Sequence, residues 1–205
     1  KHLRATKDWG LVHWRRSPNT AFPAVPLRHP PCSAELPPFP KSRLDELVGC
    51  VDAAHGTDPL ARRSVTGFVF CFAGGTVAYK TKSQSTVATS STEAELIAAV
   101  HAAKVAKYLR SVLTDLGCPP PGPTILHEDN EAAVKIVNRD IPTERSRHAE
   151  IQTCALLEWR SRKQLVLRSI PGIINPSDAL TKALGWILQH RHVRRAMGHC
   201  GPPHL

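Results

Sequence analysis

Apolar and polar positions alternate along the first half of the chain in a way that predicts three strands. Residues 47–52 form a short apolar run, and residues 66–73 and 76–82 are two runs rich in aromatic and β-branched side chains. The second and third runs are joined through Gly74 and Gly75, which is typical of a β-hairpin. We therefore expect a strand followed by a hairpin.

A different period follows the hairpin and predicts a long helix. Gly117, with Cys118 and Pro119 behind it, predicts where this helix ends. Beyond it we expect a strand over 124–129, helices over 131–138 and 148–160, a strand over 165–170, and a last helix beginning near Asn175. Helices alternating with strands predict an α/β domain with a mixed sheet. The helical stripe, with intervals of three and four residues, consists of Ala98, Ala102, Val105, Leu109, Val112 and Leu116.

Proline separates the beginning of the chain from this domain. Residues 17–46 contain eight prolines, which lock φ and remove backbone donors, so we expect a linker or a surface insertion there. A short basic segment, residues 1–16, precedes it. The predicted domain covers residues 47–184, and residues 185–205 are interpreted as a basic C-terminal tail.

The charge of the chain favours a polyanionic partner. Lys and Arg number 27 against 17 Asp and Glu, for a formal net charge of +10. Nucleic acid is the first expectation and an acidic membrane surface the second, while a charge that serves solubility alone stays open. No apolar run approaches the roughly 18 residues of a membrane helix. The six cysteines are scattered, which disfavours a zinc site and suits a reducing intracellular compartment.

Four carboxylates stand where predicted elements begin or end. Asp52 closes the first apolar run, Glu95 lies in the first turn of the long helix, Asp129 closes the fourth strand, and Asp178 lies in the first turn of the last helix. Each has a structural explanation on its own. Thr92 and Glu95 have the spacing of a capping box, and acids are common at helix N-termini.

Together the four acids predict a metal site. Carboxylates within about 5 Å repel one another unless cations intervene. Hard oxygen ligands suit Mg²⁺ or Mn²⁺, and two such ions about 3.5–4 Å apart can activate water and stabilise the leaving oxygen in phosphodiester cleavage. An acidic metal pocket in a basic protein therefore indicates a nuclease or a polynucleotide transferase.

Five ordered motifs resemble the ribonuclease H domain of copia-type retroelements. A segment upstream, residues 3–13, is similar to the reverse transcriptase tail that precedes this domain in the family, which assigns residues 1–16 to that tail. The motifs read GCVDA at 49–53 with RRSVTGFVF at 62–70, SSTEAE at 90–95, EDNEAA at 128–133, RH at 147–148 and DALTK at 178–182.

The resemblance implies a ribonuclease H-like fold, a five-stranded mixed sheet flanked by helices. It also implies that Asp52, Glu95, Asp129 and Asp178 bind two Mg²⁺ ions (or Mn²⁺) and cut the RNA strand of RNA–DNA hybrids. Glu93, the other glutamate of its motif, is expected to be solvated or capping. The implied partners are the hybrid and the reverse transcriptase of the same polyprotein. The implied place is a cytoplasmic retrotransposon particle, with no membrane partner.

Some positions depart from the family pattern. Ala54 and His55 stand where the family often has an aspartate and a tryptophan, and Leu96 replaces a usual tyrosine. The pattern is also largely lost around 149–157. An inactive remnant that binds nucleic acid or packs on a polymerase domain is therefore the alternative. A transposase or integrase core of the same fold is a second one, which the ordered motifs disfavour.

Candidate substrate contacts surround the four acids. Basic side chains would hold phosphates, and small polar groups would read 2′-hydroxyls of the RNA strand. His148 is either a helper in catalysis or a structural histidine. The candidates are Lys80, Lys82, Arg145, Arg147 and His148 on the basic side, and Gln84, Ser90, Ser91 and Asn130 among the small polar groups.

Overall fold

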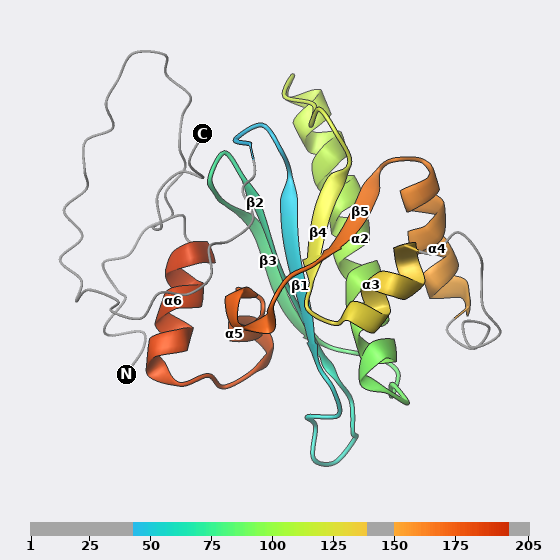
Figure 1. Cartoon of the computed structure of the whole chain (residues 1–205), viewed down its shortest axis with the longest axis vertical. Helices are drawn as coiled ribbons and strands as arrows, with labels where there is room; N and C mark the ends of the chain where they lie inside the picture. Colours follow the sequence, from blue (N-terminus) through green and yellow to red (C-terminus); the bar gives the residue numbers. More distant parts are fainter. Residues whose placement is uncertain (1–42, 139–149, 197–205) are drawn as a thin grey trace.

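In the computed structural model, which describes residues 43–138 and 150–196, five strands form one mixed sheet (Figure 1). The order across the sheet is β3-β2-β1-β4-β5. β1 pairs antiparallel with β2 and parallel with β4, while β2–β3 is antiparallel and β4–β5 is parallel. This confirms the predicted mixed sheet. The strands are β1 (Val48–Ala54), β2 (Val65–Phe72), β3 (Gly75–Ser83), β4 (Thr124–Glu128) and β5 (Leu165–Ser169).

Helices cover both faces of the sheet. The long helix α2 packs on β1, β2 and β4, and it also contacts α3 and α4. On the other side α5 packs on β1, β2 and β3, with α6 beside it (Figure 1). The helices are α2 (Ser91–Asp115), α3 (Glu131–Asn138), α4 (Glu150–Ser161), the 3-10 turn η2 (Gly172–Ile174), α5 (Asp178–Thr181) and α6 (Trp186–Ala196).

The core lies between the sheet and α2. Phe68, Phe70 and Leu126 point toward the helix from β2 and β4 and are at most 2% exposed. The facing side of α2 is built from alanines, including Ala98 and Ala102, which are fully buried. Small side chains let the helix lie close to the sheet, and this close approach brings the beginning of α2 to the ends of β1 and β4.

Local signals set both ends of α2. Ser90 is the N-cap, and its hydroxyl accepts a hydrogen bond from the Glu93 amide at 3.1 Å. The Glu93 carboxylate accepts in turn from the Thr89 amide and hydroxyl. Of the two glutamates in this motif, Glu93 is therefore the one that takes part in capping, as expected. At the other end Gly117 has a φ of +76°, and Cys118 N donates to Leu113 O at 2.8 Å.

The capping geometry corrects one interpretation of the sequence. The box is Ser90–Glu93, not Thr92–Glu95, because the helix begins two residues earlier than the Thr92 box requires. Glu95 consequently lies in the second turn, not the first, and its side chain has no capping role. The structural explanation for that acid is thereby removed.

Three boundaries differ from expectation. β1 continues to Ala54, so Asp52 lies within the strand and does not close it. The last helix was expected to begin near Asn175, but α5 begins at Asp178 and ends at Thr181, where the extended backbone of Lys182 follows. Residues 186–196 of the predicted tail form a helix.

The division into domains stays a prediction, and residues 1–42 lie outside the described part. None of the helices described is long and apolar enough to cross a membrane.

Candidate active site

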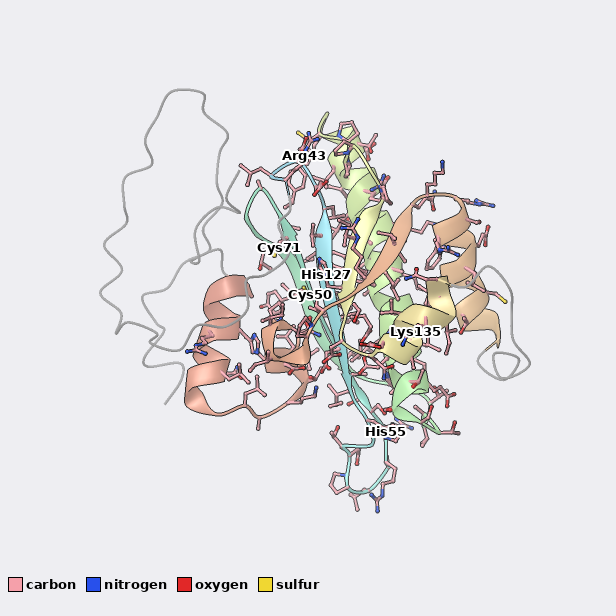
Figure 2. All side chains as sticks on the ribbon, viewed as in Figure 1. Arg43, Cys50, His55, Cys71, His127 and Lys135 are labelled. Carbon is pink, nitrogen blue, oxygen red and sulfur yellow. The ribbon has the colours of Figure 1, made fainter. Side chains whose placement is uncertain are left out.

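Two parallel strands place the first pair of acids. Cys50 on β1 lies beside His127 on β4 (Figure 2), and two residues further along the chain from each come Asp52 and Asp129. The carboxyl ends of adjacent parallel strands are a common place for ligand sites in α/β proteins. Asp52 is fully buried, and Asp129 follows directly after the last residue of β4.

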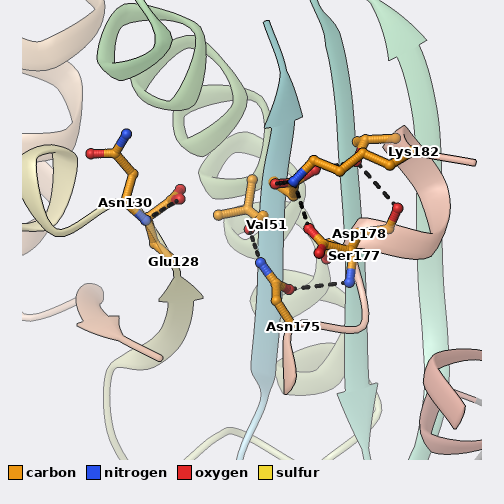
Figure 3. Close-up of polar contacts among 9 residues, drawn as sticks. Val51, Glu128, Asn130, Asn175, Ser177, Asp178 and Lys182 are labelled. Atoms are coloured by element: carbon orange, nitrogen blue, oxygen red, sulfur yellow. Dashed lines mark hydrogen bonds and ion pairs between the residues drawn. The ribbon is translucent and has the colours of Figure 1, made fainter. Parts of the chain in front are cut away.

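Asp178 joins this pair from the α5 side of the sheet. Asp52, Asp129 and Asp178 each offer a carboxylate oxygen within 4.8 Å of the others. The ammonium of Lys182, one turn beyond Asp178, lies 2.8 Å from Asp178 Oδ1 and 3.0 Å from Asp52 Oδ1 (Figure 3). The Thr181 hydroxyl also donates to Asp52. In this arrangement Lys182 offsets part of the negative charge of Asp52 and Asp178.

Glu95 and Glu128 approach from the α2 side. Side chains alternate along β4, so Glu128 shares the face of Leu126, which packs against α2. Glu95, Glu128 and Asp129 form a second group whose oxygens lie within 4.8 Å of one another. Asp129 belongs to both groups. The five acids therefore form one cluster at this end of the sheet, and Asp129 connects its two groups.

The pKa values reflect crowding on the α2 side. Burial, and then the charges of Asp52 and Asp129, raise the pKa of Glu95 to about 9. Burial and the charge of Glu95 raise the pKa of Glu128 well above its ordinary value. Without a cation, this group holds protons near neutral pH.

The α5 side is partly neutralised by lysine. Burial raises the pKa of Asp178 to about 6, although the bond to Lys182 opposes the rise. Burial works against the charge of Lys182, but its bonds to Asp178 and Asp52 outweigh burial and raise its pKa. Lys182 therefore stays charged and keeps these two carboxylates together.

The loop before α5 is fastened to β1 by a buried asparagine. Asn175 Nδ2 donates to Val51 O at 2.8 Å, and Asn175 Oδ1 accepts from Ser177 N at 3.1 Å (Figure 3). Asn175 and Ser177 are fully buried. One amide thus links the strand that carries Asp52 to the turn that carries Asp178.

Replacing Asn175 with alanine is expected to destabilise the protein by about 1–3 kcal/mol, because it leaves a buried carbonyl and a buried amide without partners. Urea unfolding measures this loss, and metal titration should show weaker binding as well. Asn138→Ala is the control, since Asn138 Nδ2 bonds to Leu167 O away from the acids. Equal losses of metal affinity in both variants would contradict a positioning role for Asn175.

A glycine opposite Asp52 makes room for α5. Gly67 on β2 pairs with Asp52. A Cβ atom at Gly67 would lie 2.5 Å from Thr181 Cγ2, 2.9 Å from Leu180 Cβ and 3.2 Å from Ser177 O. These distances are too short for carbon contacts, so only glycine lets α5 lie this close to the sheet.

Gly67→Ala is therefore expected to push α5 outward and move Asp178 and Lys182 away from Asp52. We expect a stability loss of about 1–3 kcal/mol from overpacking and a metal affinity at least about tenfold lower. Calorimetric titration with Mn²⁺ measures the second effect. Gly122→Ala is the control, because a Cβ there meets nothing within 4 Å. Unchanged affinity in Gly67→Ala would contradict this account.

The donor set suits hard divalent cations. All five side chains offer carboxylate oxygens, the ligands that Mg²⁺ and Mn²⁺ prefer. Glu95 Oε2 and Glu128 Oε2 are buried and accept no hydrogen bond from the described residues. Buried carboxylate oxygens without donors are costly unless a cation or a proton satisfies them. The acids can therefore form a metal site.

The predicted substrate residues fall into four sets, and the first two are buried or bonded to backbone. Gln84 was expected to read 2′-hydroxyls of the substrate, but it is buried, and its amide donates to Thr66 Oγ1 and Ala94 O. Ser90 caps α2, and Asn130 Oδ1 accepts from Ala133 N at the start of α3. Contact of these two residues with substrate stays a prediction.

The remaining candidates are surface residues or lie outside the described part. Lys80, Lys82 and Ser91 are exposed, on β3 and at the start of α2. Their contact with substrate also stays a prediction. Arg145, Arg147 and His148 lie outside the described residues.

Sequence reasoning missed three residues of the site: Lys182, Glu128 and Asn175. Lys182 and Glu128 were quoted inside motifs without a role. His55, which directly follows β1 (Figure 2), donates from Nε2 to Ala88 O at 3.1 Å and connects the end of this strand to the segment before α2. The position therefore has a structural role despite departing from the family pattern.

Known proteins resemble this chain in sequence and in fold. Over 138 residues, 67% of the chain, it is 31% identical to the retrovirus-related Pol polyprotein from transposon TNT 1-94 of Nicotiana tabacum. The chain is homologous to part of a retrotransposon Pol polyprotein. It spans 10% of the length of that relative. Secreted RxLR effector protein 161 of Plasmopara viticola is 41% identical over 71 residues, 35% of this chain and 50% of that protein. No model of a known protein family matches the chain.

The fold is that of ribonuclease H1. LC11-RNase H1, isolated from compost, superposes with a TM-score of 0.52 at 16% identity, covering 67% of this chain and 93% of that one. The same protein in complex with an RNA/DNA hybrid gives a TM-score of 0.50 at 15% identity, over 66% and 94%. At these identities the likeness concerns the fold.

Proposed function

We propose that this chain is a metal-dependent ribonuclease that cuts the RNA strand of RNA–DNA hybrids during reverse transcription of a copia-type retrotransposon. The observation that carries the proposal is the cluster of acids around Asp129, at the ends of two parallel strands in a ribonuclease H fold. The polyprotein homology and the hybrid complex of LC11-RNase H1 support the same substrate.

Four carboxylates would hold the metals. Asp52, Asp129 and Asp178 are the candidates for one ion, and Glu95 and Asp129 for the other. Bound Mg²⁺ or Mn²⁺ would supply an activated water and stabilise the charge that develops on the leaving oxygen. Lys182 lies on the solvent side of this group, with 41% of its side chain exposed, so it can contact a phosphate as well as Asp52.

Basic residues near α2 would hold the substrate backbone. Burial first, and then the charges of Lys104, Lys82 and Lys80, lower the pKa of His101. The three lysines are therefore near enough to act on that histidine by charge, Lys104 from α2 and the other two from β3. Because each phosphate contact releases counterions, hybrid binding should weaken steeply as salt rises. The proposed setting is a reverse-transcribing particle in the cytoplasm, with the polymerase of the same polyprotein as partner.

The test is cleavage of one hybrid labelled on either strand, in Mg²⁺ and in EDTA, beside double-stranded DNA of the same sequence. We expect metal-dependent cutting of the RNA strand alone. Binding of the hybrid without cutting, with and without the upstream polymerase, would reject the enzyme and leave a nucleic-acid-binding remnant. Binding that does not change with salt would reject the lysine contacts.

A further inference from the structure

Glu128 lies inside the acidic group, although it is not one of the four acids that the resemblance implies. It is the last residue of β4, it is fully buried, and an oxygen of its carboxylate lies within 4.8 Å of oxygens of Glu95 and Asp129. When ionised, Glu128 adds a fifth negative charge to the four other carboxylates of the site.

The hydrogen bonds of Glu128 leave one oxygen unsatisfied. Oε1 accepts from the Asn130 amide at 3.1 Å (Figure 3). Oε2 is buried and accepts no bond from the described residues, and the same holds for Glu95 Oε2. Among the described residues, the ion pairs of the site join Lys182 to Asp52 and Asp178, and no ion pair involves Glu128. Two residues of one candidate metal-binding group therefore each have a buried oxygen that accepts no hydrogen bond from the described residues.

We propose that Glu128 is a metal ligand, and that Glu95, Glu128 and Asp129 together bind the second divalent cation of the site. The inference rests on the proposed function in that it assumes a metal-dependent site. Two divalent cations and the Lys182 ammonium would balance the five carboxylates, whereas four carboxylates would leave a surplus of positive charge. The charges of these five acids and Lys182 are thus balanced by two divalent ions when Glu128 is ionised and binds one of them.

A structural role makes a different prediction. Glu128 could serve only as a protonated carboxyl that donates to Glu95. Glutamine would then replace it well, because its amide is also a neutral donor of nearly the same size. A metal ligand would not tolerate this change, because the amide loses the charge that attracts the cation.

The test counts Mn²⁺ bound to the full chain in the absence of substrate, by electron paramagnetic resonance of the free ion. Glu128→Gln is compared with the wild type and with Glu131→Gln. Glu131 is in the same motif, but it is exposed and paired with Lys135 at 2.9 Å. Glu128→Asp keeps the charge on a shorter side chain, and circular dichroism establishes that each variant is folded.

We expect two Mn²⁺ in the wild type and in Glu131→Gln. In Glu128→Gln the second ion should bind at least about tenfold more weakly, since the loss of an indirect partner of a metal already costs 10–100-fold. Glu128→Asp should lie between these. Two ions bound to Glu128→Gln with wild-type affinity would overturn the proposal, as would fewer than two in the wild type.

The outcome is separable from that of the proposed function. If the wild type binds two Mn²⁺ and Glu128→Gln loses one, the metal site stands even when the hybrid is left uncut. If the hybrid is cut while Glu128→Gln keeps both ions, the nuclease stands and the role of Glu128 falls.

Discussion

Replacing Asp129 with asparagine is expected to lower the rate of RNA cleavage at least about a thousandfold. Asp129 belongs to both groups of acids, so the change removes a ligand from each candidate ion. A thousandfold corresponds to about 4 kcal/mol of transition-state stabilisation, the scale expected when a metal's contribution is lost. The measurement is single-turnover cleavage of a hybrid with labelled RNA under saturating enzyme.

The fold should survive this substitution. Asparagine has the same shape, and it removes one charge from a crowded group, so the free energy of unfolding should be unchanged or slightly higher without metal. Asp115→Asn is the matched control, because Asp115 is exposed at the far end of α2 and should leave cleavage unchanged. A cleavage rate in Asp129→Asn within tenfold of wild type would contradict the proposed site.

The metal-free protein is expected to lose stability as the pH rises from 7 to 9. The pKa of Glu95 is about 9 in the folded chain, above its value of 4.5 when exposed. Its contribution is fully present below pH 4.5 and is lost as the pH rises through 9. Each proton held only by the folded state gives a slope of about −1.4 kcal/mol per pH unit. The pKa of Glu128, raised in the same direction, adds to this loss.

Thermal unfolding in EDTA and in Mg²⁺ tests this expectation. We expect the midpoint in EDTA to fall by roughly 2–4 °C for each kcal/mol lost. Mg²⁺ should restore it more at pH 9 than at pH 7, because the ion binds ionised carboxylates. The range begins at pH 7 because burial lowers the pKa of His127 to about 4, which opposes this slope at lower pH. A Glu95→Gln variant with the same slope as wild type would contradict the assignment.

The sequence predicted the elements well because their signals are local. The hairpin at Gly74, the helix ending at Gly117 and the α3 helix over 131–138 depend on residues within one or two turns of each other. The four acids were predicted because they belong to local motifs of a recognisable family. Their convergence around Asp129 followed from the fold that the resemblance implied.

The rest of the site depends on contacts that no local pattern shows. Lys182 lies 130 residues from Asp52 in sequence, and Asn175 lies 124 residues from Val51, yet each pair is in direct contact. The role of Gly67 depends on the distance between β2 and α5, which the sequence does not specify. Gln84 was predicted as a substrate contact because it is polar, but its amide forms hydrogen bonds inside the protein.

The most direct test of the central claim is incubation of the wild-type chain with a hybrid whose RNA strand is labelled, in Mg²⁺ and in EDTA. Our account predicts that the RNA strand is cut in Mg²⁺, with the DNA strand intact, and that EDTA stops the reaction. An RNA strand that stays whole in Mg²⁺ and in Mn²⁺, on a protein that binds the hybrid and is supplied with its polymerase domain, would contradict it.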